Sequence, residues 1–500
     1  MGAVPKRLSQ WVAGEPAQVE VGETVEVINP GTGEVTASLT FSTEADIDWA
    51  TEQAREAQSK WAKVSLAKRS EVMFKMRELV TQNQDRIARV LVAEHGKNYS
   101  DAIGEIQRGR ETIDFACGIT TALKGSHTSG ASTGIDVHTL HQPVGTVLGV
   151  TPFNFPFMVP AWMHPIALAT GNAFILKPPS TAPSAALIVA ELYKEAGLPD
   201  GLFQVVFGEK DEVEYLLDHP GIDAVSFVGS TAVAKAVRDR GVRTGKRVQA
   251  LGGANNHAII MPDADLDAVA PNLAAAAFGA AGERCMALPV VIAVGGIGDE
   301  LGKKVAAQAK NIRVGYGMDE GVEMGAIITP QAKDRIVALI DDAEARDVSV
   351  VLDGRDLKVA GYEQGIYLGP TVLTHVPLDA PVYSQEVFGP VLVIVDASSY
   401  EEAIEILNSS PYGNGAVIFT ESGGVARQFT IEAQAGMVGV NVPIPTPVAY
   451  YSFGGWKDSM MGDVDIHGPD GVRFYTREKK ITTRWFARAS DATLSFRRED

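Results

Sequence analysis

The chain has 500 residues, of which 45% are hydrophobic and 21% charged, a composition that excludes disordered and fibrous proteins. Its formal net charge of −18 argues against nucleic acid as the main partner, because phosphate binding needs clustered Lys and Arg. A chain of this length exceeds what one hydrophobic core usually organises, so more than one domain is expected.

The cysteine content and the distribution of apolar residues indicate which cellular compartment and class of protein to expect. The two cysteines, Cys117 and Cys285, cannot form a disulfide framework, which favours a reducing, cytoplasmic location. The opening MGAVPKRLSQW shows no secretory signal pattern. Residues 137–176 contain no Asp, Glu, Lys or Arg, but prolines interrupt them too often for a spanning helix. We therefore expect this stretch to be buried core, and we expect no membrane partner.

The predicted elements alternate along the chain. The first hundred or so residues predict helices with charged faces, because 46–64 and 65–96 repeat apolar side chains at helical spacing. Short apolar runs then alternate with helical segments. The predicted strands are 144–150, 172–177, 203–207, 224–229 and 247–251, with helices over 159–171 and 183–197. This alternation predicts an α/β fold with a mostly parallel sheet that helices cover on both sides.

The same alternation restarts after Gly252. Strands are expected at 257–261 and 289–296, and helices at 265–282 and 301–312. This predicts a second α/β domain that begins near residue 250 and contains Cys285. Residues 466–486 are expected to be extended edge material, which favours pairing with another subunit.

Two features suggest a site for a phosphorylated cofactor. Gly229 and Ser230 lie between a buried strand and a helix start, where free N–H groups attract a pyrophosphate. The G-x-G-x-x-G pattern is incomplete, so a capped helix without a ligand stays an alternative. Lys177 lies at the end of a predicted strand, and its ammonium could bind an adenosine ribose or a 2′-phosphate there. The alternative is that this lysine is only a solvated charge.

The stretch FGAAGERCMALPV, residues 278–290, raises the question of what Cys285 does. Cys285 could be a small buried apolar side chain, a redox thiol or a nucleophile. As a nucleophile, it would have to react as the thiolate. Arg284 next to it is expected to raise the thiolate fraction. Asn154 in TPFNFP could donate a hydrogen bond to an oxyanion. No partner motif accompanies Cys117, which is interpreted as a buried structural cysteine. The histidines show no metal-ligand spacing, so no metal is expected.

Five motifs in matching order resemble the aldehyde dehydrogenase superfamily: TPFNFP, FVGS, LGG, GERC and QEVFGP. The resemblance runs from about residue 8 to residue 485 and implies a Rossmann-like cofactor domain, a second α/β catalytic domain and a small β extension for oligomerisation. The implied boundaries are 1–124 with 147–249 for the NAD(P)-binding domain, 250–440 for the catalytic domain, 125–146 with 465–488 for the oligomerisation strands, and 489–500 for a tail.

The resemblance also implies roles for individual residues. Cys285 would be the nucleophile that carries a thioester, and Asn154 with the Cys285 backbone N–H would hold the oxyanion. NAD would be bound by Thr151, Phe153, Lys177, Ser180, Thr181, Gly229, Ser230, Gly252, Glu386 and Phe388. A homodimer or homotetramer would be the assembly.

One departure points to a subclass. Hydrolytic members carry a water-activating Glu before Leu-Gly-Gly, where this chain has Ala250, so we expect the acyl group to leave to the thiol of coenzyme A. Together with GERCMAL, NNHA, NVPIPTP and FGGWKDS, this resembles methylmalonate-semialdehyde dehydrogenases. These imply oxidation of methylmalonate or malonate semialdehyde with NAD+ and CoA to propionyl-CoA or acetyl-CoA and CO2. The first alternative is a hydrolytic enzyme that makes a free acid, with Glu283 as the base that activates water. The second is a non-catalytic scaffold, which would have no need for Cys285 and Asn154.

A carboxylated aldehyde needs cations near the nucleophile. The resemblance implies that Arg108 and Arg284 grip the substrate carboxylate, with Arg110 as runner-up for the role of Arg108.

Two further departures from the family pattern concern the cofactor site. Ser180 replaces a Glu that would repel a 2′-phosphate, which leaves NADP open beside NAD, and Asn255 replaces a lysine.

Overall fold

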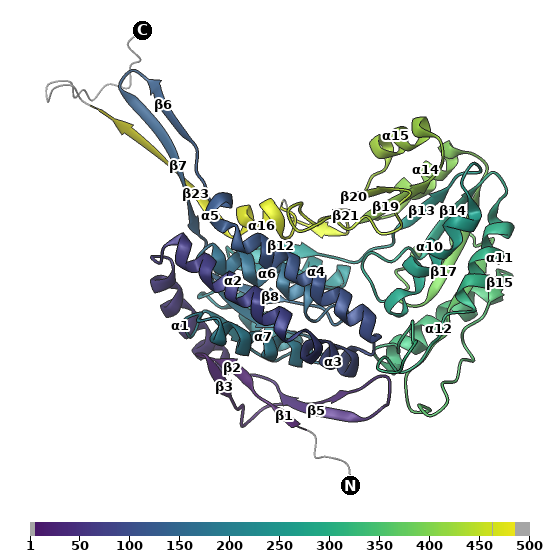
Figure 1. Ribbon diagram of the computed structural model, residues 1–500, viewed down its shortest axis with the longest axis horizontal. Helices are drawn as coiled ribbons and strands as arrows, with labels where there is room; N and C mark the ends of the chain where they lie inside the picture. Colours follow the sequence, from purple (N-terminus) through teal and green to yellow (C-terminus); the bar gives the residue numbers. More distant parts are fainter. Residues whose placement is uncertain (1–5, 463, 486–500) are drawn as a thin grey trace.

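The structure is a computed structural model that describes residues 6–462 and 464–485. The predicted tail, 489–500, and residues 486–488 of the predicted second oligomerisation segment lie outside this part. Two large sheets form the two halves of the molecule, and a small third sheet projects from one of them (Figure 1).

The chain begins with strands, so the prediction of helices from the start is wrong for residues 6–40. The strands are β1 (Lys6–Leu8), β2 (Gln10–Val12), β3 (Glu15–Ala17), β4 (Thr24–Ile28) and β5 (Val35–Thr40). β2 gains its stability by pairing with β10 (Phe203–Val205), far along the chain. Such short strands depend on partners that local periodicity does not reveal.

Helices α1 (Glu44–Trp61), α2 (Leu66–Gln82), α3 (Gln84–His95), α4 (Tyr99–Cys117) and the short α5 (Ile119–Ala122) follow. Thr43 and Asp46 form a capping box that starts α1. α3 ends at Gly96, whose φ of 90° is left-handed and favours glycine. The chain therefore turns sharply at Gly96, and Lys97 enters the interior between α3 and α4.

The first large sheet has eight strands in the order β22-β12-β11-β8-β9-β10-β2-β3. Its five central strands are parallel: β8 (Thr146–Val150), β9 (Ala173–Lys177), β10, β11 (Ala224–Val228) and β12 (Arg247–Leu251). Connecting them are α6 (Met158–Ala169), α7 (Ser184–Glu195), α8 (Lys210–Asp218) and α9 (Thr231–Arg243), while β22 (Met460–Met461) closes one edge. The chain runs from β8 to β10 in one direction and then adds β11 and β12 on the other side of β8. The order thus reverses between β8 and β11, where sheets of this kind form a ligand crevice at their carboxyl ends.

The second sheet has seven strands in the order β15-β16-β17-β14-β13-β19-β20, all parallel except β15. Its strands are β13 (His257–Ile260), β14 (Val290–Val294), β15 (Ser349–Leu352), β16 (Thr371–Thr374), β17 (Val391–Ala397), β19 (Gly415–Phe419) and β20 (Met437–Val440). Its helices are α10 (Leu266–Phe278), α11 (Gly298–Ala309), α12 (Pro330–Ala345), α13 (Pro381–Ser384), α14 (Tyr400–Ser409) and α15 (Gly423–Glu432). This half is green in Figure 1.

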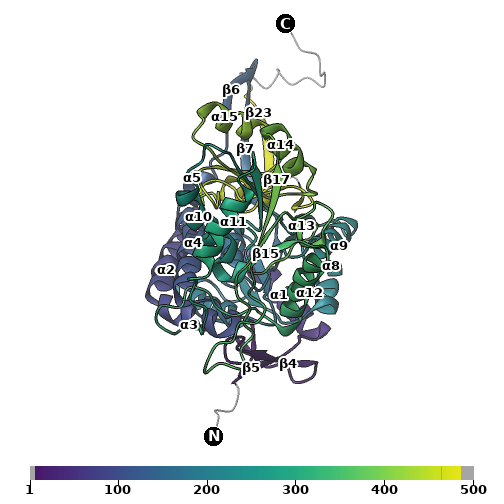
Figure 2. The same cartoon turned by 90° about the vertical axis from the view of Figure 1, so that its right-hand side faces the viewer.

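The third sheet, β23-β7-β6, is antiparallel and is built from β6 (His127–Ser132), β7 (Ile135–Pro143) and β23 (Thr476–Arg484). It extends away from the body at the end opposite β4 and β5 (Figure 2). Residues 468–474, which we expected to be extended, form helix α16 (Gly468–Phe474). A two-stranded sheet of β18 (Tyr412–Gly413) and β21 (Trp456–Lys457) completes the elements. The domain boundaries drawn from the sequence stay a prediction.

Residues 144–176 of the predicted apolar core pack inside the first half. The expectation of burial is wrong for residues 137–143, which lie in β7 of the projecting sheet and are half-buried or exposed. Every residue of α6 is buried, and Pro165 lies within this helix. In the described part of the chain, no helix combines the length and the apolar character that crossing a bilayer requires.

Candidate active site

Cys285 lies on a tightly folded loop between α10 and β14. Ala280 and Ala281 adopt left-handed φ angles of 48° and 53°, which are unusual for residues with a Cβ. A Cβ on Gly282 would lie 2.1 Å from the carbonyl oxygen of Gly389, so glycine is required where these two loops touch. The loop is therefore held in one conformation by its neighbours.

Two asparagines fix the backbone of the cysteine itself. Asn256 donates to the carbonyl oxygen of Cys285 at 2.9 Å and to that of Ala287 at 2.7 Å, and Asn414 donates to the Cys285 oxygen at 3.1 Å. Asn256 also accepts a bond from the backbone N–H of Gly415 at 2.8 Å. Since both asparagines are buried, these bonds tie the cysteine loop to β13 and β19.

Cys285 faces a cavity of about 380 Å³ that both halves of the molecule line. α4 and α6 form one wall, and the loop that follows β20 forms another. The lining residues are Ser100, Asp101, Gly104, Glu105, Arg108, Phe155, Met158, Trp162, Arg284, Cys285, Met286, Ile444, Thr446 and Phe453. The two arginines predicted to act on a carboxylate thus share one cavity with the predicted nucleophile.

Each arginine already has partners. Arg284 donates to Asp101 at 2.6 Å, and both side chains are about four-fifths buried. Arg108 donates to both carboxylate oxygens of Glu111, at 3.1 and 3.0 Å, and to the carbonyl oxygen of Thr446 at 3.1 Å. Arg110 donates to Thr81 on α2 and does not line the cavity, which removes it as runner-up.

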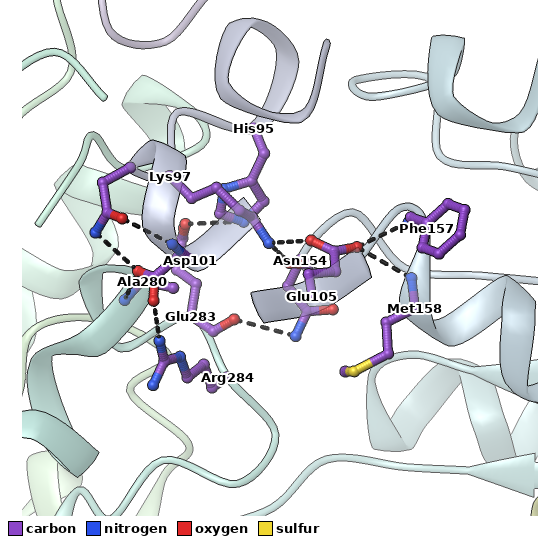
Figure 3. A network of polar contacts seen from close by, with 11 residues as sticks. His95, Lys97, Asp101, Glu105, Asn154, Phe157, Met158, Ala280, Glu283 and Arg284 are labelled. Carbon is purple, nitrogen blue, oxygen red and sulfur yellow. Dashed lines mark hydrogen bonds and ion pairs between the residues drawn. The ribbon is translucent and has the colours of Figure 1, made fainter. Parts of the chain in front are cut away.

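Asn154 is positioned by a buried ion pair (Figure 3). Lys97 donates to Glu105 at 2.5 Å and to the carbonyl oxygen of Asn154 at 2.7 Å, with both charged side chains fully buried. Glu105 in turn accepts the backbone N–H groups of Phe157 and Met158. The Asn154 amide donates to the carbonyl oxygen of Glu283 at 3.1 Å, on the cysteine loop. An amide nitrogen carries two N–H groups, so one remains for an oxyanion.

The thiol is not activated in this arrangement. Burial is the main cause that raises the pKa of Cys285 to about 12, and the Glu386 carboxylate adds to it. The backbone N–H groups of Cys285 and Met286 oppose this shift, and Arg284 opposes it least. The expected direction of the Arg284 effect is thus confirmed, because its charge lowers the pKa of Cys285. The effect is too small to offset burial, since the guanidinium is paired with Asp101.

Glu283, the candidate base of the hydrolytic alternative, points away from the cavity. Its carboxyl is fully buried beside His95, with 3.8 Å between Oε2 and Nε2, and it accepts the backbone N–H of Ile328 at 3.3 Å. Burial raises the pKa of Glu283 to about 8 and lowers the pKa of His95 well below its usual value. Both side chains are thus mainly neutral at pH 7, and the Glu283 side chain is not among the groups that line the cavity.

Several predicted cofactor residues meet at the switch between β8 and β11. Thr151 follows β8, and Gly229 and Ser230 follow β11. The Thr151 hydroxyl is buried and has no hydrogen-bond partner among the described residues. An unpaired buried hydroxyl is costly, so this orphaned group suits a ligand. Ser230 is the N-cap of α9 but makes no side-chain cap bond, which leaves its hydroxyl available as well.

The LGG motif brings Glu386 close to the same region. A Cβ on Gly253 would lie 2.4 Å from Oε2 of Glu386, and a Cβ on Gly252 would lie 2.5 Å from the Asp458 carbonyl oxygen. Glu386 accepts the backbone N–H of Ala254 at 2.9 Å, and burial raises its pKa to about 7. Both glycines are therefore needed for close approach.

The predicted aromatic contacts form a short stack. The rings of Phe153 and Phe388 lie edge to face at 5.9 Å, and His95 stacks on Phe153 at 6.0 Å. Phe388 has a left-handed φ of 48°. Away from this stack, Ser180 donates to Glu209 at 2.5 Å, and Thr181 beside it is half-buried. Asn255, the other departure, donates to the Tyr383 carbonyl oxygen at 2.7 Å.

Ala250 lies in the interior of β12 and is fully buried. It is paired with Phe227 of β11 on one side and with Met461 of β22 on the other. This position thus offers a methyl group where a carboxylate would be needed to activate water.

Residues 17–481 match the aldehyde dehydrogenase family. The chain belongs to the aldehyde dehydrogenase family. The superfamily resemblance predicted from the sequence is thereby confirmed. The aldehyde dehydrogenase fold is confirmed too, by solved structures with TM-scores of 0.96 and 0.95.

Several similar aldehyde dehydrogenases bear the name malonate-semialdehyde or methylmalonate-semialdehyde dehydrogenase. A malonate-semialdehyde dehydrogenase of Pseudomonas aeruginosa is 46% identical over 95% of this chain and 96% of its own length. One from Geobacillus thermodenitrificans is 46% identical over 96% and 99%. A Sinorhizobium meliloti protein described as a methylmalonate-semialdehyde dehydrogenase, in complex with NAD, has a TM-score of 0.96 at 45% identity, covering 98% of this chain and 100% of that one. The methylmalonate-semialdehyde dehydrogenase of Oceanimonas doudoroffii has a TM-score of 0.95 at 43% identity, covering 97% and 100%.

Sequence reasoning missed the residues that support this aldehyde dehydrogenase site. Lys97, Asp101 and Glu105 hold Asn154 and Arg284, and Asn256 and Asn414 hold Cys285. A signal existed for Asn256, because the two asparagines that follow Gly-Gly-Ala and precede a buried strand need hydrogen-bond partners. No comparable signal marks Lys97.

Replacing Lys97 with Met should leave the Glu105 carboxylate buried and unpaired. Removing one partner of a buried pair costs about 3–5 kcal/mol, and Asn154 also loses its anchor. We expect a clearly lower midpoint in urea unfolding and a lower kcat. Lys60→Met is the control, because Lys60 forms an exposed pair with Glu56 and should leave both quantities unchanged. Equal midpoints for the two variants would contradict this assignment.

Proposed function

We propose that this aldehyde dehydrogenase oxidises malonate semialdehyde or methylmalonate semialdehyde with NAD+ and passes the acyl group to coenzyme A. The products are acetyl-CoA or propionyl-CoA, and CO2. Support comes from the names of the relatives at 46% identity over nearly the whole chain. The hydrolytic alternative, which would release a free acid, is less well supported.

The observation that carries the proposal is the state of the carboxylates around Cys285. Two carboxylates, Asp101 and Glu105, line the cavity of the cysteine. Asp101 is bound to Arg284, Asn98 and the N–H of Ala280, and Glu105 is bound to Lys97 and two backbone N–H groups. A carboxylate engaged in this way is a poor base for water. A thiol acceptor ionises far more readily than water and needs less help.

In the first step, the Cys285 thiolate adds to the aldehyde carbon and the carbonyl oxygen becomes an oxyanion. The free N–H of Asn154 and the backbone N–H of Cys285 would donate to this oxyanion. The buried Lys97–Glu105 pair keeps the amide of Asn154 in place, so little reorganisation is needed when the charge develops.

The described residues fit a nicotinamide dinucleotide at the β8–β11 switch. The orphaned Thr151 hydroxyl, the start of α9 after Ser230 and the Glu386 carboxylate would hold it. When bound, NAD+ supplies the hydride acceptor that turns the thiohemiacetal on Cys285 into a thioester. Phe153 and Phe388 would exclude water on this side.

The acyl group then moves from Cys285 to the CoA thiolate, and the cysteine leaves as a thiolate. In the substrate, the carboxylate that later departs as CO2 would be gripped by Arg108 and Arg284. Both arginines would contact the carboxyl group and not the aldehyde, so they would affect substrate binding and the loss of CO2 but not the attack by the Cys285 thiolate.

We also propose a homodimer or homotetramer in the cytoplasm. The projecting sheet β23-β7-β6 leaves every residue of β6 exposed, and such edges suit pairing with another subunit. Both cysteines are free thiols, which suits a reducing compartment.

Steady-state assays with malonate semialdehyde should show NADH formation that depends on CoA. Cys285→Ala should abolish this turnover while NAD+ binding is retained, because only the nucleophile is lost. Cys117→Ala is the matched control, since this buried thiol lies outside the cavity. Equal NADH formation with and without CoA would count against the acyl-transfer proposal.

Arg108→Leu should raise KM for malonate semialdehyde by about 10- to 100-fold, the value of a lost charge-assisted hydrogen bond. KM for propanal should change little, because propanal has no carboxylate. Arg110→Leu lies on the same helix but faces α2 and serves as the control. Similar losses on both aldehydes would show that Arg108 has a structural role instead.

Glu283→Gln should leave the ratio of CoA-dependent to CoA-independent turnover unchanged, because Glu283 points toward His95. A selective loss of CoA-independent acid formation would identify Glu283 as a hydrolytic base. Because the pKa of Glu283 is raised to about 8, the folded protein retains a proton that the unfolded chain releases near the ordinary carboxyl pKa of 4.5. Stability therefore falls as pH rises toward 8, and the Tm advantage of Glu283→Gln over the parent should grow between pH 6 and pH 8.

A further inference from the structure

Two neighbouring strands of the first sheet carry opposite charges at their carboxyl ends. Lys177 ends β9, and Glu209 follows β10, its parallel neighbour. The Lys177 side chain is 6% exposed, and its ammonium makes no hydrogen bond to any other described residue. A buried, unpaired ammonium at the end of a sheet strand suits an oxygen-rich ligand.

Two carboxylates, Glu209 and Glu212, act on the charge of this ammonium. Burial lowers the pKa of Lys177, and the carboxylates of Glu209 and Glu212 act against this shift. Glu212 is itself engaged, because it accepts the backbone N–H of Glu209 at 2.8 Å. The Glu209 side chain is exposed at the surface, and one of its oxygens accepts the hydroxyl of Ser180 at 2.5 Å.

The bond from Ser180 orients the Glu209 carboxylate. Ser180 also contacts the carbonyl oxygen of Gly208 at 3.4 Å, so its hydroxyl faces the loop after β10. Glu209 also forms a capping box with Glu212 at the start of α8. Within the described part of the chain, its second carboxylate oxygen has no hydrogen bond to another side chain and can accept from a ligand hydroxyl. Lysine, serine and glutamate thus frame one small polar site between two strand ends.

We propose that Glu209 is a specificity-determining residue that selects NAD+ over NADP+ at the ribose of the adenosine half. This inference rests on the proposed function, in which Lys177 binds that half of the dinucleotide. Glu209 accepts the ribose 2′-hydroxyl with its free oxygen, while Lys177 donates to the neighbouring oxygen. The absence of a glutamate at position 180 therefore does not open the site to NADP+, because the negative charge comes from the adjacent strand.

The physical reason is the charge at the 2′ position. A 2′-phosphate carries a charge of about −2 near neutral pH, and it would stand next to the Glu209 carboxylate. Like charges a few ångströms apart near a protein surface disfavour binding by about tenfold or more. Lys177 would compensate only in part, since burial lowers its pKa and so disfavours its charged form.

The test compares dinucleotide selectivity in the full-length enzyme. The parent should bind NAD+ at least about tenfold more tightly than NADP+, by quenching of tryptophan fluorescence. Glu209→Gln, which keeps the bond from Ser180, should raise kcat/KM and affinity for NADP+ relative to NAD+ by about tenfold or more. Glu209→Lys should raise them further, because the charge is reversed.

Asp211→Asn is the matched control. Asp211 lies in the first turn of α8, so its removal takes the same charge from the same helix end without touching Ser180. It should leave selectivity within about twofold of the parent. A parent that prefers NADP+, or a Glu209→Gln variant whose selectivity matches that of Asp211→Asn, would overturn the inference.

A failure of the proposed function would give a different experimental result from a failure of this inference. A parent that binds neither dinucleotide would refute the cofactor site and the inference with it. A parent that oxidises semialdehyde with NAD+ but shows unaltered selectivity in both Glu209 variants would refute the inference alone.

Discussion

The site depends on the buried contact between Lys97 and Glu105. Two charges removed from water must be paired and hydrogen-bonded, and both conditions are met here. The pair joins α4 to the turn that follows β8 and to the start of α6, and Lys97 also lies 4.4 Å from the Phe155 ring. Because Asn154 lies in that turn and contacts the Glu283 carbonyl, this pair also sets how the two halves of the molecule meet at Cys285.

The parts of the fold that could be predicted are those whose signal is local. The strands of the two large sheets are continuous apolar runs, such as AFILK (173–177) and VVIAV (290–294), and both are buried on both faces. β1 to β5 were missed because they are short; β2–β3 and β4–β5 are local antiparallel pairs, while β2 also pairs with the distant β10. Residues 468–474 were misjudged for a related reason: the helix is capped and packed by contacts with residues 449–452 and α6, which sequence spacing does not show.

The candidate site was predictable only where residues carry the chemistry themselves. Cys285, Asn154 and Glu386 stand in recognisable motifs, whereas Asn414 and Asp101 act through partners more than a hundred residues away. Arg284 shows how adjacency in sequence misleads. It precedes the nucleophile, yet its guanidinium turns toward Asp101 on α4, so its effect on the thiol is smaller than that of burial or of Glu386.

The charges around Cys285 indicate how binding and reactivity are linked. Arg284 and Asp101 are about four-fifths buried, so separating them would expose two desolvated charges. Arg108 and Glu111 are more than a third exposed, and Glu111 can be hydrated when its partner turns away. In the proposed complex, Arg108 would therefore turn toward a substrate carboxylate more easily, while Arg284 would keep its bond to Asp101 and offer its remaining N–H groups. Burial, and the Glu386 carboxylate to a lesser degree, raise the pKa of Cys285 to about 12 and so favour the protonated thiol. A bound ligand that brings positive charge near the sulfur would lower this pKa and favour the thiolate that attacks.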